Sequence, residues 1–303
     1  MRDFFNNLSS SFAHRSTKEL KQLVRLFRLL SSPRISKLGI QLMKRFGHIK
    51  LPGFQIIQRL LFYPFYAGTT LQESESTVAS LSNYGVYSYL NYAIEDSSTE
   101  SEFDTNCEMV QNLIIHAAKT NNIPFSVCKP TSFGHKHLFQ KINAKHSLST
   151  EEQVAWKRVI DRFRCCCQTA LQHGVALLVD AEEYSMQIAT DQVVMDLMRE
   201  FNMSKAVVYN TVQLYLVDGN RRLKQMHNIA TKEGFYLGLK LVRGAYMEKE
   251  RKIAQRQGLA SPICITKVET DMNFNVGVAY CLKHLVNIAV VLGSHNEESV
   301  IQA

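Results

Sequence analysis

The chain has 303 residues, of which 46% are hydrophobic and 20% are charged, a composition ordinary for a globular protein. Its net charge of +8 is uneven, because residues 1–50 hold 11 Lys and Arg against two acidic residues, a net of +9, which leaves −1 for residues 51–303. The main body therefore carries no excess of basic residues of the kind that binds nucleic acid, and we expect no nucleic-acid partner.

The cysteines and the apolar segments exclude further classes of protein. Seven cysteines without a CxxC pair indicate reduced thiols in a reducing compartment. Cys165–Cys167 lies in a helical pattern, where adjacent side chains diverge, so we expect packing and no metal site. The longest apolar tract, residues 56–67, is broken by Gln58, Arg59 and Pro64 and is shorter than the about 20 residues of a membrane span. These features predict a cytoplasmic protein.

Residues 17–47 have apolar residues at helical spacing, with charges on the other face. This pattern predicts two or three helices before the main domain. We expect a helical extension over residues 1–80 and the main domain over residues 81–303. The basic, amphipathic helices allow two interpretations: they pack on the domain, or they make a peripheral contact with an anionic membrane.

From residue 86 onwards, short β-branched runs alternate with longer amphipathic stretches. Helical patterns cover residues 103–121, 151–174 and 271–285. This alternation predicts an α/β fold with a parallel sheet covered by helices. The six predicted strands lie at residues 86–94, 124–130, 175–183, 206–216, 236–246 and 286–296.

The alternation fits either an open doubly wound sheet or a closed (β/α)8 barrel. No GxGxxG follows the first strand and no GxxxxGK[ST] occurs, which removes the main support for a nucleotide-binding open sheet. Polar residues instead follow several different strands, as they do on the active-site face of barrel enzymes. Six strands are fewer than eight, so we expect a barrel truncated after six strand–helix units. The strand-end residues are Lys129, Asp180, Asn210, Gln213, Lys240, Arg243, His295 and Asn296.

Such a rim combines cations, one carboxylate, amides and an imidazole. It suits a ligand that carries phosphate or carboxylate groups together with a hydrogen-bonding heterocycle. Taken singly, each residue is also explained by an ion pair with a neighbour. The absence of paired strand-end carboxylates disfavours glycoside hydrolysis, and no Ser or Cys lies in a nucleophile elbow.

Four motifs, in this order and spacing, resemble the proline dehydrogenases, and most closely their single-function bacterial members. The motifs are LLVDAEE (177–183), VVYNTVQLYL (207–216), KLVRGAY (240–246) and GSHNEESV (293–300). The resemblance implies a distorted (β/α)8 TIM-like barrel and FAD-dependent oxidation of L-proline to 1-pyrroline-5-carboxylate in proline catabolism. It also implies electron transfer to a membrane quinone, and hence a peripheral position at the inner membrane, on the matrix side in a mitochondrion.

The resemblance also implies residue roles. Asp180 and Lys240 would be catalytic, with the Lys240 cation beside the flavin nitrogen that accepts hydride. Lys129 would hold the substrate carboxylate, and Leu241 and Tyr246 would pack on the substrate ring. The residues implied to contact FAD are Ala181, Asn210, Gln213, Lys240, Arg243, Gly244, Ala245, Thr266, Lys267, His295 and Asn296. Two alternatives stay open: a catalytically silent barrel that binds flavin or a partner, and a hydroxyproline dehydrogenase.

Overall fold

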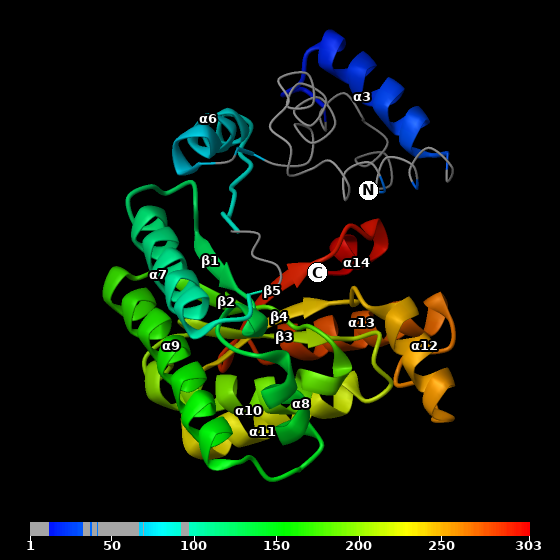
Figure 1. Ribbon diagram of the computed structural model, residues 1–303. Helices are drawn as coiled ribbons and strands as arrows, with labels where there is room; N and C mark the ends of the chain where they lie inside the picture. The colour runs from blue at the N-terminus through cyan, green and yellow to red at the C-terminus, as the bar shows by residue number, and fades with distance from the viewer. Residues whose placement is uncertain (1–11, 33–36, 38–40, 42–66, 69, 92–96) are drawn as a thin grey trace. The chain divides into compact units, whose positions relative to one another are not determined.

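The computed structural model describes residues 12–32, 37, 41, 67–68, 70–91 and 97–303. The chain divides into two compact units, residues 1–88 and 89–303. Figure 1 shows the described elements of each unit along the chain. None of the described helices combines the length and the apolar character that a bilayer crossing requires.

The described part of the first unit contains helices α3 (Thr17–Leu30) and α6 (Leu71–Ser82). A capping box starts α3: the Ser16 side chain accepts from the Glu19 amide, and the Glu19 carboxylate accepts from the Ser16 amide. This reciprocal pair satisfies two amide groups that a helix start leaves without partners. No side chain of α3 is buried. The other helices predicted up to residue 47 fall almost entirely outside the described residues.

The second unit is built on a parallel sheet of five strands in the sequential order β1-β2-β3-β4-β5. Each strand therefore pairs with the next strand along the chain, which is the winding of a (β/α) barrel rather than of a doubly wound sheet. The strands are β1 (Phe125–Cys128), β2 (Ala176–Val179), β3 (Val208–Gln213), β4 (Leu237–Val242) and β5 (Ile288–Gly293).

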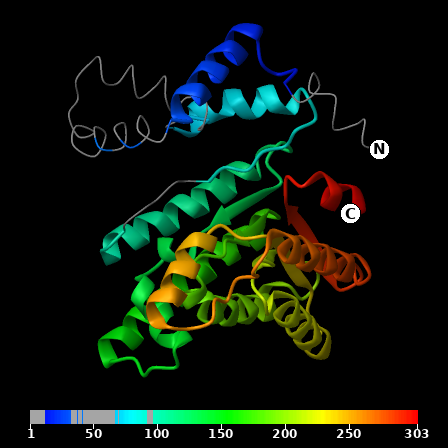
Figure 2. The same ribbon diagram turned by 90° about the vertical axis from the view of Figure 1, so that its right-hand side faces the viewer.

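Helices surround the outer side of this sheet (Figure 2). Helix α7 packs on β1, α9 on β2, α10 and α11 on β3, and α13 on β4 and β5. The helices are α7 (Glu100–Ala117), α8 (Lys136–Asn143), α9 (Thr150–His173), α10 (Tyr184–Phe201), α11 (Gly219–Glu233), α12 (Met247–Gln257), α13 (Lys267–Leu282) and α14 (Glu297–Gln302), with a 3-10 turn at Pro130–Ser132.

Five of the six predicted strands correspond to strands of the sheet. The first predicted strand, residues 86–94, does not: residues 86–91 adopt no regular structure, and residues 92–94 lie outside the described part of the chain. Its apolar residues are mostly aromatic or β-branched, the types enriched in strands, so composition alone could not show that residues 86–91 form no strand. The α/β class with a parallel sheet is confirmed.

Two of the three side chains of the Cys165–Cys167 run on α9 pack in the interior, because adjacent residues of a helix point in different directions. Cys166 and Cys167 are completely buried, whereas Cys165 is exposed. The Cys166 sulfur lies 3.7 Å from the sulfur of Cys107 on α7. These thiols therefore fill the α7–α9 interface as small hydrophobic groups.

A close approach between β3 and β4 requires Gly238. A methyl group at this position would lie 2.4 Å from the Val208 carbonyl oxygen and 2.9 Å from the Tyr209 ring. We expect Gly238→Ala to lower the free energy of unfolding by about 1–3 kcal/mol, the usual cost of overpacking. Urea unfolding of both proteins measures this change. The exposed substitution Cys165→Ala is the control and should leave stability unaltered, and an equal effect of the two would contradict the steric argument.

Candidate active site

The parallel register brings three polar residues from three strands into one row. Val179 pairs with Asn210, and Thr211 pairs with Lys240, so Asp180, one residue beyond Val179, lies level with Thr211. The Asp180 amide donates to the Cys128 carbonyl at 2.9 Å, which extends the same row to Lys129 after β1. Residues in one row of a sheet point to the same face.

An ion pair crosses this row. The Lys240 Nζ lies 2.6 Å from Asp180 Oδ1, although β3 separates their strands. Neighbouring strands are about 4.8 Å apart, a span that a lysine and an aspartate side chain reach together. The Thr211 hydroxyl between them donates to the Val179 carbonyl at 2.8 Å, so it leaves the carboxylate to Lys240. The pair is largely buried, with 15% of the Lys240 side chain and 21% of the Asp180 side chain accessible to solvent.

Strand alternation places Gln213, at the end of β3, on the same face as Thr211, but its buried side chain reaches α10. Its amide nitrogen donates to the Glu182 carbonyl and to Gln187 Oε1, each at 3.0 Å. Asn210 is an odd number of residues away from Gln213 and therefore points to the other face. The structure places its amide against the helices, where it donates to Asp191 of α10 at 2.8 Å. Asn210 therefore does not join the Asp180–Lys240 cluster.

Leu241 alternates with Lys240 in the same way. It is completely buried in β4, and alternation turns its side chain towards the helical layer. The structure therefore does not bring Leu241 to the face that carries the ion pair.

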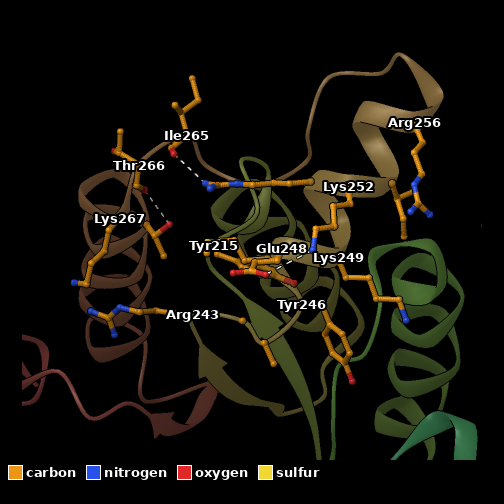
Figure 3. A pocket seen from close by; sticks show the side chains of 16 residues that line it. Tyr215, Arg243, Tyr246, Glu248, Lys249, Lys252, Arg256, Ile265, Thr266 and Lys267 are labelled. Atoms are coloured by element: carbon orange, nitrogen blue, oxygen red, sulfur yellow. Dashed lines mark hydrogen bonds and ion pairs between the residues drawn. The ribbon is translucent and has the colours of Figure 1, made fainter. Parts of the chain in front are cut away.

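A cleft of about 1040 Å³ opens where β4 leads into α12. Figure 3 shows Arg243 and Lys267 on one side of the cleft and Lys249, Lys252 and Arg256 on the other. Gly244, Ala245, Tyr246 and Thr266 also line it, so six of the predicted site residues meet here. The cleft attracts anions, because its charged lining is Arg243, Lys249, Arg251, Lys252, Arg256 and Lys267 against one acid, Glu248.

Gly244 lines the cleft at a position where no larger residue fits. Its φ of +141° lies in a region that other residues rarely adopt. A methyl group there would lie 2.5 Å from the ring of Tyr215. The buried Tyr215 ring therefore supports the Gly244 backbone, and burial raises the pKa of Tyr215 above its usual range.

Arg243 is held from three directions. Its Nε donates to Asp271 of α13 at 2.7 Å, and its two terminal nitrogens donate to Ser294 at 2.8 Å and Ser299 at 3.0 Å. The guanidinium also lies 4.4 Å from the centre of the Phe274 ring. Arg243 therefore fastens the end of β4 to α13 and α14 while lining the cleft.

Three of the remaining predicted residues lie at helix starts, and two lie in loops after strands. Thr266 caps α13 in a capping box with Glu269, and Lys267 pairs with Asp271 at 2.5 Å. Asn296 accepts from the Ser299 amide and so caps α14. His295 is exposed, and Ala181 is half-buried directly after Asp180.

Glu183, after β2, connects two helices to the sheet. It is 8% exposed and accepts from Lys136 of α8 and Lys249 of α12, each at 2.6 Å. Burial opposes its charge, but the two ammonium groups outweigh burial and hold the pKa of this carboxyl below its usual range. The adjacent Tyr184 amide donates to Glu250 of α12 at 2.9 Å. This bond also holds α12, whose residues line the cleft, against the segment after β2.

Three residues at this end of the sheet were not predicted as site residues: Glu182, Thr211 and Tyr215. Thr211 could have been found by strand alternation from Gln213. Glu182 is part of the LLVDAEE motif, but its contact with the loop after β1 has no signal in the sequence. Tyr215 lies beneath Gly244, a contact that depends on the fold alone.

The chain matches known proteins in both sequence and fold. The sequence profile of the family described as proline dehydrogenase matches residues 74–303. The chain belongs to the proline dehydrogenase family. Relatives include the carbapenem antibiotics biosynthesis protein CarD of Pectobacterium carotovorum, which is 37% identical over 237 residues, or 78% of this chain and 62% of that protein.

Another relative is the mitochondrial proline dehydrogenase 1 of Dictyostelium discoideum, 29% identical over 86% of this chain and 53% of its own length. This chain thus spans between half and two thirds of these two relatives. Among solved structures, proline utilization A from Bdellovibrio bacteriovorus, inactivated by N-propargylglycine, matches with a TM-score of 0.72. Its 19% identity, over 100% of this chain and 32% of that one, supports a common fold.

The Glu183 ion pairs make stability depend on pH. A carboxyl whose pKa is lowered on folding stabilises the protein above its unfolded pKa, near 4.5, and loses this contribution as pH falls. We expect Glu183→Gln to cost about 1 kcal/mol at pH 7, a modest value because both lysines are partly solvated. Thermal unfolding at pH 7 and at pH 4 tests this. The deficit should shrink at pH 4, and a deficit independent of pH would show that the charge is not its origin.

Proposed function

We propose that this chain carries the FAD-dependent oxidation of L-proline to 1-pyrroline-5-carboxylate in proline catabolism. The observation that supports it most is the Asp180–Lys240 ion pair, at the carboxyl end of a sequentially wound parallel sheet in a member of this family. Barrel enzymes build their active sites at that end.

The cleft where β4 leads into α12 supports the proposal of FAD as cofactor. Small-molecule sites enclose roughly 300–1,000 Å³, and the about 1040 Å³ here suits a long ligand. Its six basic side chains outnumber the acids that pair with them, because Arg243 and Lys267 share Asp271, and the excess positive charge suits a diphosphate. Gly244 lets the backbone that lines the cleft pass closely over the Tyr215 ring. In this proposal Arg243, Gly244, Ala245, Thr266 and Lys267 hold FAD within the cleft. Ala181, Gln213, Lys240, His295 and Asn296 contact it from the strand ends.

When bound, FAD would accept a hydride from the proline ring carbon beside the nitrogen. Lys240 supplies positive charge on the face of the sheet where the reaction takes place, and Asp180 holds that ammonium group in place. Lys129, in the same row, binds the substrate carboxylate as a cation. Tyr246, which lines the cleft, packs on the substrate ring. A membrane quinone takes the electrons in this scheme.

We expect Lys240→Met and Asp180→Asn each to slow proline oxidation by about 100-fold or more, the scale of losing one preorganised electrostatic group. The full chain is reconstituted with FAD, and loss of flavin absorbance after addition of proline without oxygen gives the rate. Circular dichroism should show an unchanged fold. Lys119→Met, at an exposed position after α7, is the matched control for the loss of a lysine.

The outcomes separate the competing functions. Turnover close to wild type in both variants rules out the assigned site. FAD bound but never reduced by proline identifies a catalytically silent flavin-binding barrel. Faster reduction by hydroxyproline than by proline identifies a hydroxyproline dehydrogenase.

We also propose that α3 brings the protein to an anionic membrane, where a quinone is available. Its basic residues Lys18, Lys21, Arg25 and Arg28 lie on one side of the helix. On the other side Val24 is 49% exposed and Phe27 54% exposed. A helix with one basic and one apolar face lies stably in a lipid interface.

Co-sedimentation with vesicles that contain phosphatidylserine tests this contact. Each Lys or Arg near such a surface contributes about 1 kcal/mol, so the double variant Arg25→Glu/Arg28→Glu should bind at least about tenfold more weakly at low salt. High salt should release the wild-type chain, because ions screen the attraction. Lys119→Glu/Lys157→Glu, which reverses two exposed lysines of the second unit, is the charge-matched control. A wild-type chain that stays in the supernatant at low salt contradicts the proposal.

A further inference from the structure

The 3-10 turn that follows β1 lacks a cap of its own. Lys129 is its N-cap, and its side chain makes no capping bond. Pro130 has no amide hydrogen, so the Thr131 amide is the first donor that the turn leaves without a partner inside it. The backbone that carries Lys129 therefore needs an acceptor from another part of the chain.

Glu182, after β2, provides that acceptor. Its Oε2 accepts from the Thr131 amide at 2.9 Å, and its Oε1 accepts from the Thr131 hydroxyl at 2.8 Å. Hydrogen bonds to a carboxylate are about twice as strong as those between neutral groups. Glu182 thus caps the turn from a strand end 51 residues away in the sequence.

The backbone of Glu182 also contacts β3, because its carbonyl accepts from the Gln213 amide at 3.0 Å. One residue therefore connects the ends of β1, β2 and β3. Burial raises the pKa of the Glu182 carboxyl, while the Thr131 bonds and the nearby Lys129 charge oppose that rise. The Thr131 bonds thus hold the Glu182 carboxyl group at the edge of the row that contains Asp180.

We propose that Glu182 is a positioning residue for Lys129: by capping the Pro130–Ser132 turn it holds the lysine level with the Asp180–Lys240 pair. Its effect on substrate rests on the proposed function, in which Lys129 binds the proline carboxylate. The capping itself does not depend on that function. The chemistry that Glu182 serves is recognition of a carboxylate, not hydride transfer.

Hydrogen–deuterium exchange of the full chain tests the capping. In Glu182→Ala the Thr131 amide loses its acceptor, and in Glu182→Gln a neutral amide replaces the carboxylate. We expect residues 129–133 to exchange at least about tenfold faster in Glu182→Ala, the change that 1.4 kcal/mol produces. Glu200→Gln, which removes an exposed carboxylate at the far end of α10, should leave this segment protected. Unchanged exchange in Glu182→Ala overturns the capping role.

Steady-state kinetics of the FAD-loaded chain test the positioning. We expect Glu182→Ala to raise the KM for proline about tenfold while kcat stays within about threefold, because the lysine binds substrate and takes no part in hydride transfer. In the otherwise wild-type chain, Thr131→Ser keeps both donors and should leave the KM at the wild-type value. Thr131→Val lacks the hydroxyl and should give an intermediate KM.

The outcomes distinguish this inference from the proposed function. An unchanged KM in Glu182→Ala overturns the positioning role. A fall in kcat as large as the rise in KM, together with a lower melting temperature, overturns it as well, because these changes indicate a general structural role. A wild-type chain that does not oxidise proline overturns the proposed function and the substrate role of Lys129, and the exchange rates then still decide whether Glu182 caps the turn.

Discussion

The parallel register of β2, β3 and β4 is the constraint on which the site depends. Because Thr211 pairs with Lys240 and Val179 with Asn210, the ends of β2 and β4 are level across β3. The Lys240 ammonium can then reach Asp180 at 2.6 Å. A shift of one residue would turn the lysine to the helical layer and leave the carboxylate without its cation.

The strand ends also hold the surrounding helices. Glu183 attaches α8 and α12, and Arg243 attaches α13 and α14. Charged residues at these positions can satisfy one another because the carboxyl ends of parallel strands meet at one edge of the sheet. The cleft is therefore bounded by helices that ion pairs fix in place.

The sequential winding of the sheet agrees with the family to which the chain belongs. It places the loops after consecutive strands beside one another, so the turn after β1 meets the segment after β2. The contact between Thr131 and Glu182 is a direct product of that neighbourhood. In a doubly wound sheet the strand order reverses at a switch point, where successive loops would separate.

The sequence by itself determined the class of fold, five of the strands and the residues that follow them, because β-branched runs, caps and strand-end polarity are local signals. It therefore predicted Asp180 and Lys240 as members of one site. Only the tertiary structure decided which way each side chain points. Asn210 and Leu241 were predicted to contact ligand, yet the alternation of β3 and β4 turns both to the helical layer. Glu182 and Tyr215 act through contacts with distant residues, and no local pattern in the sequence records the register that creates them.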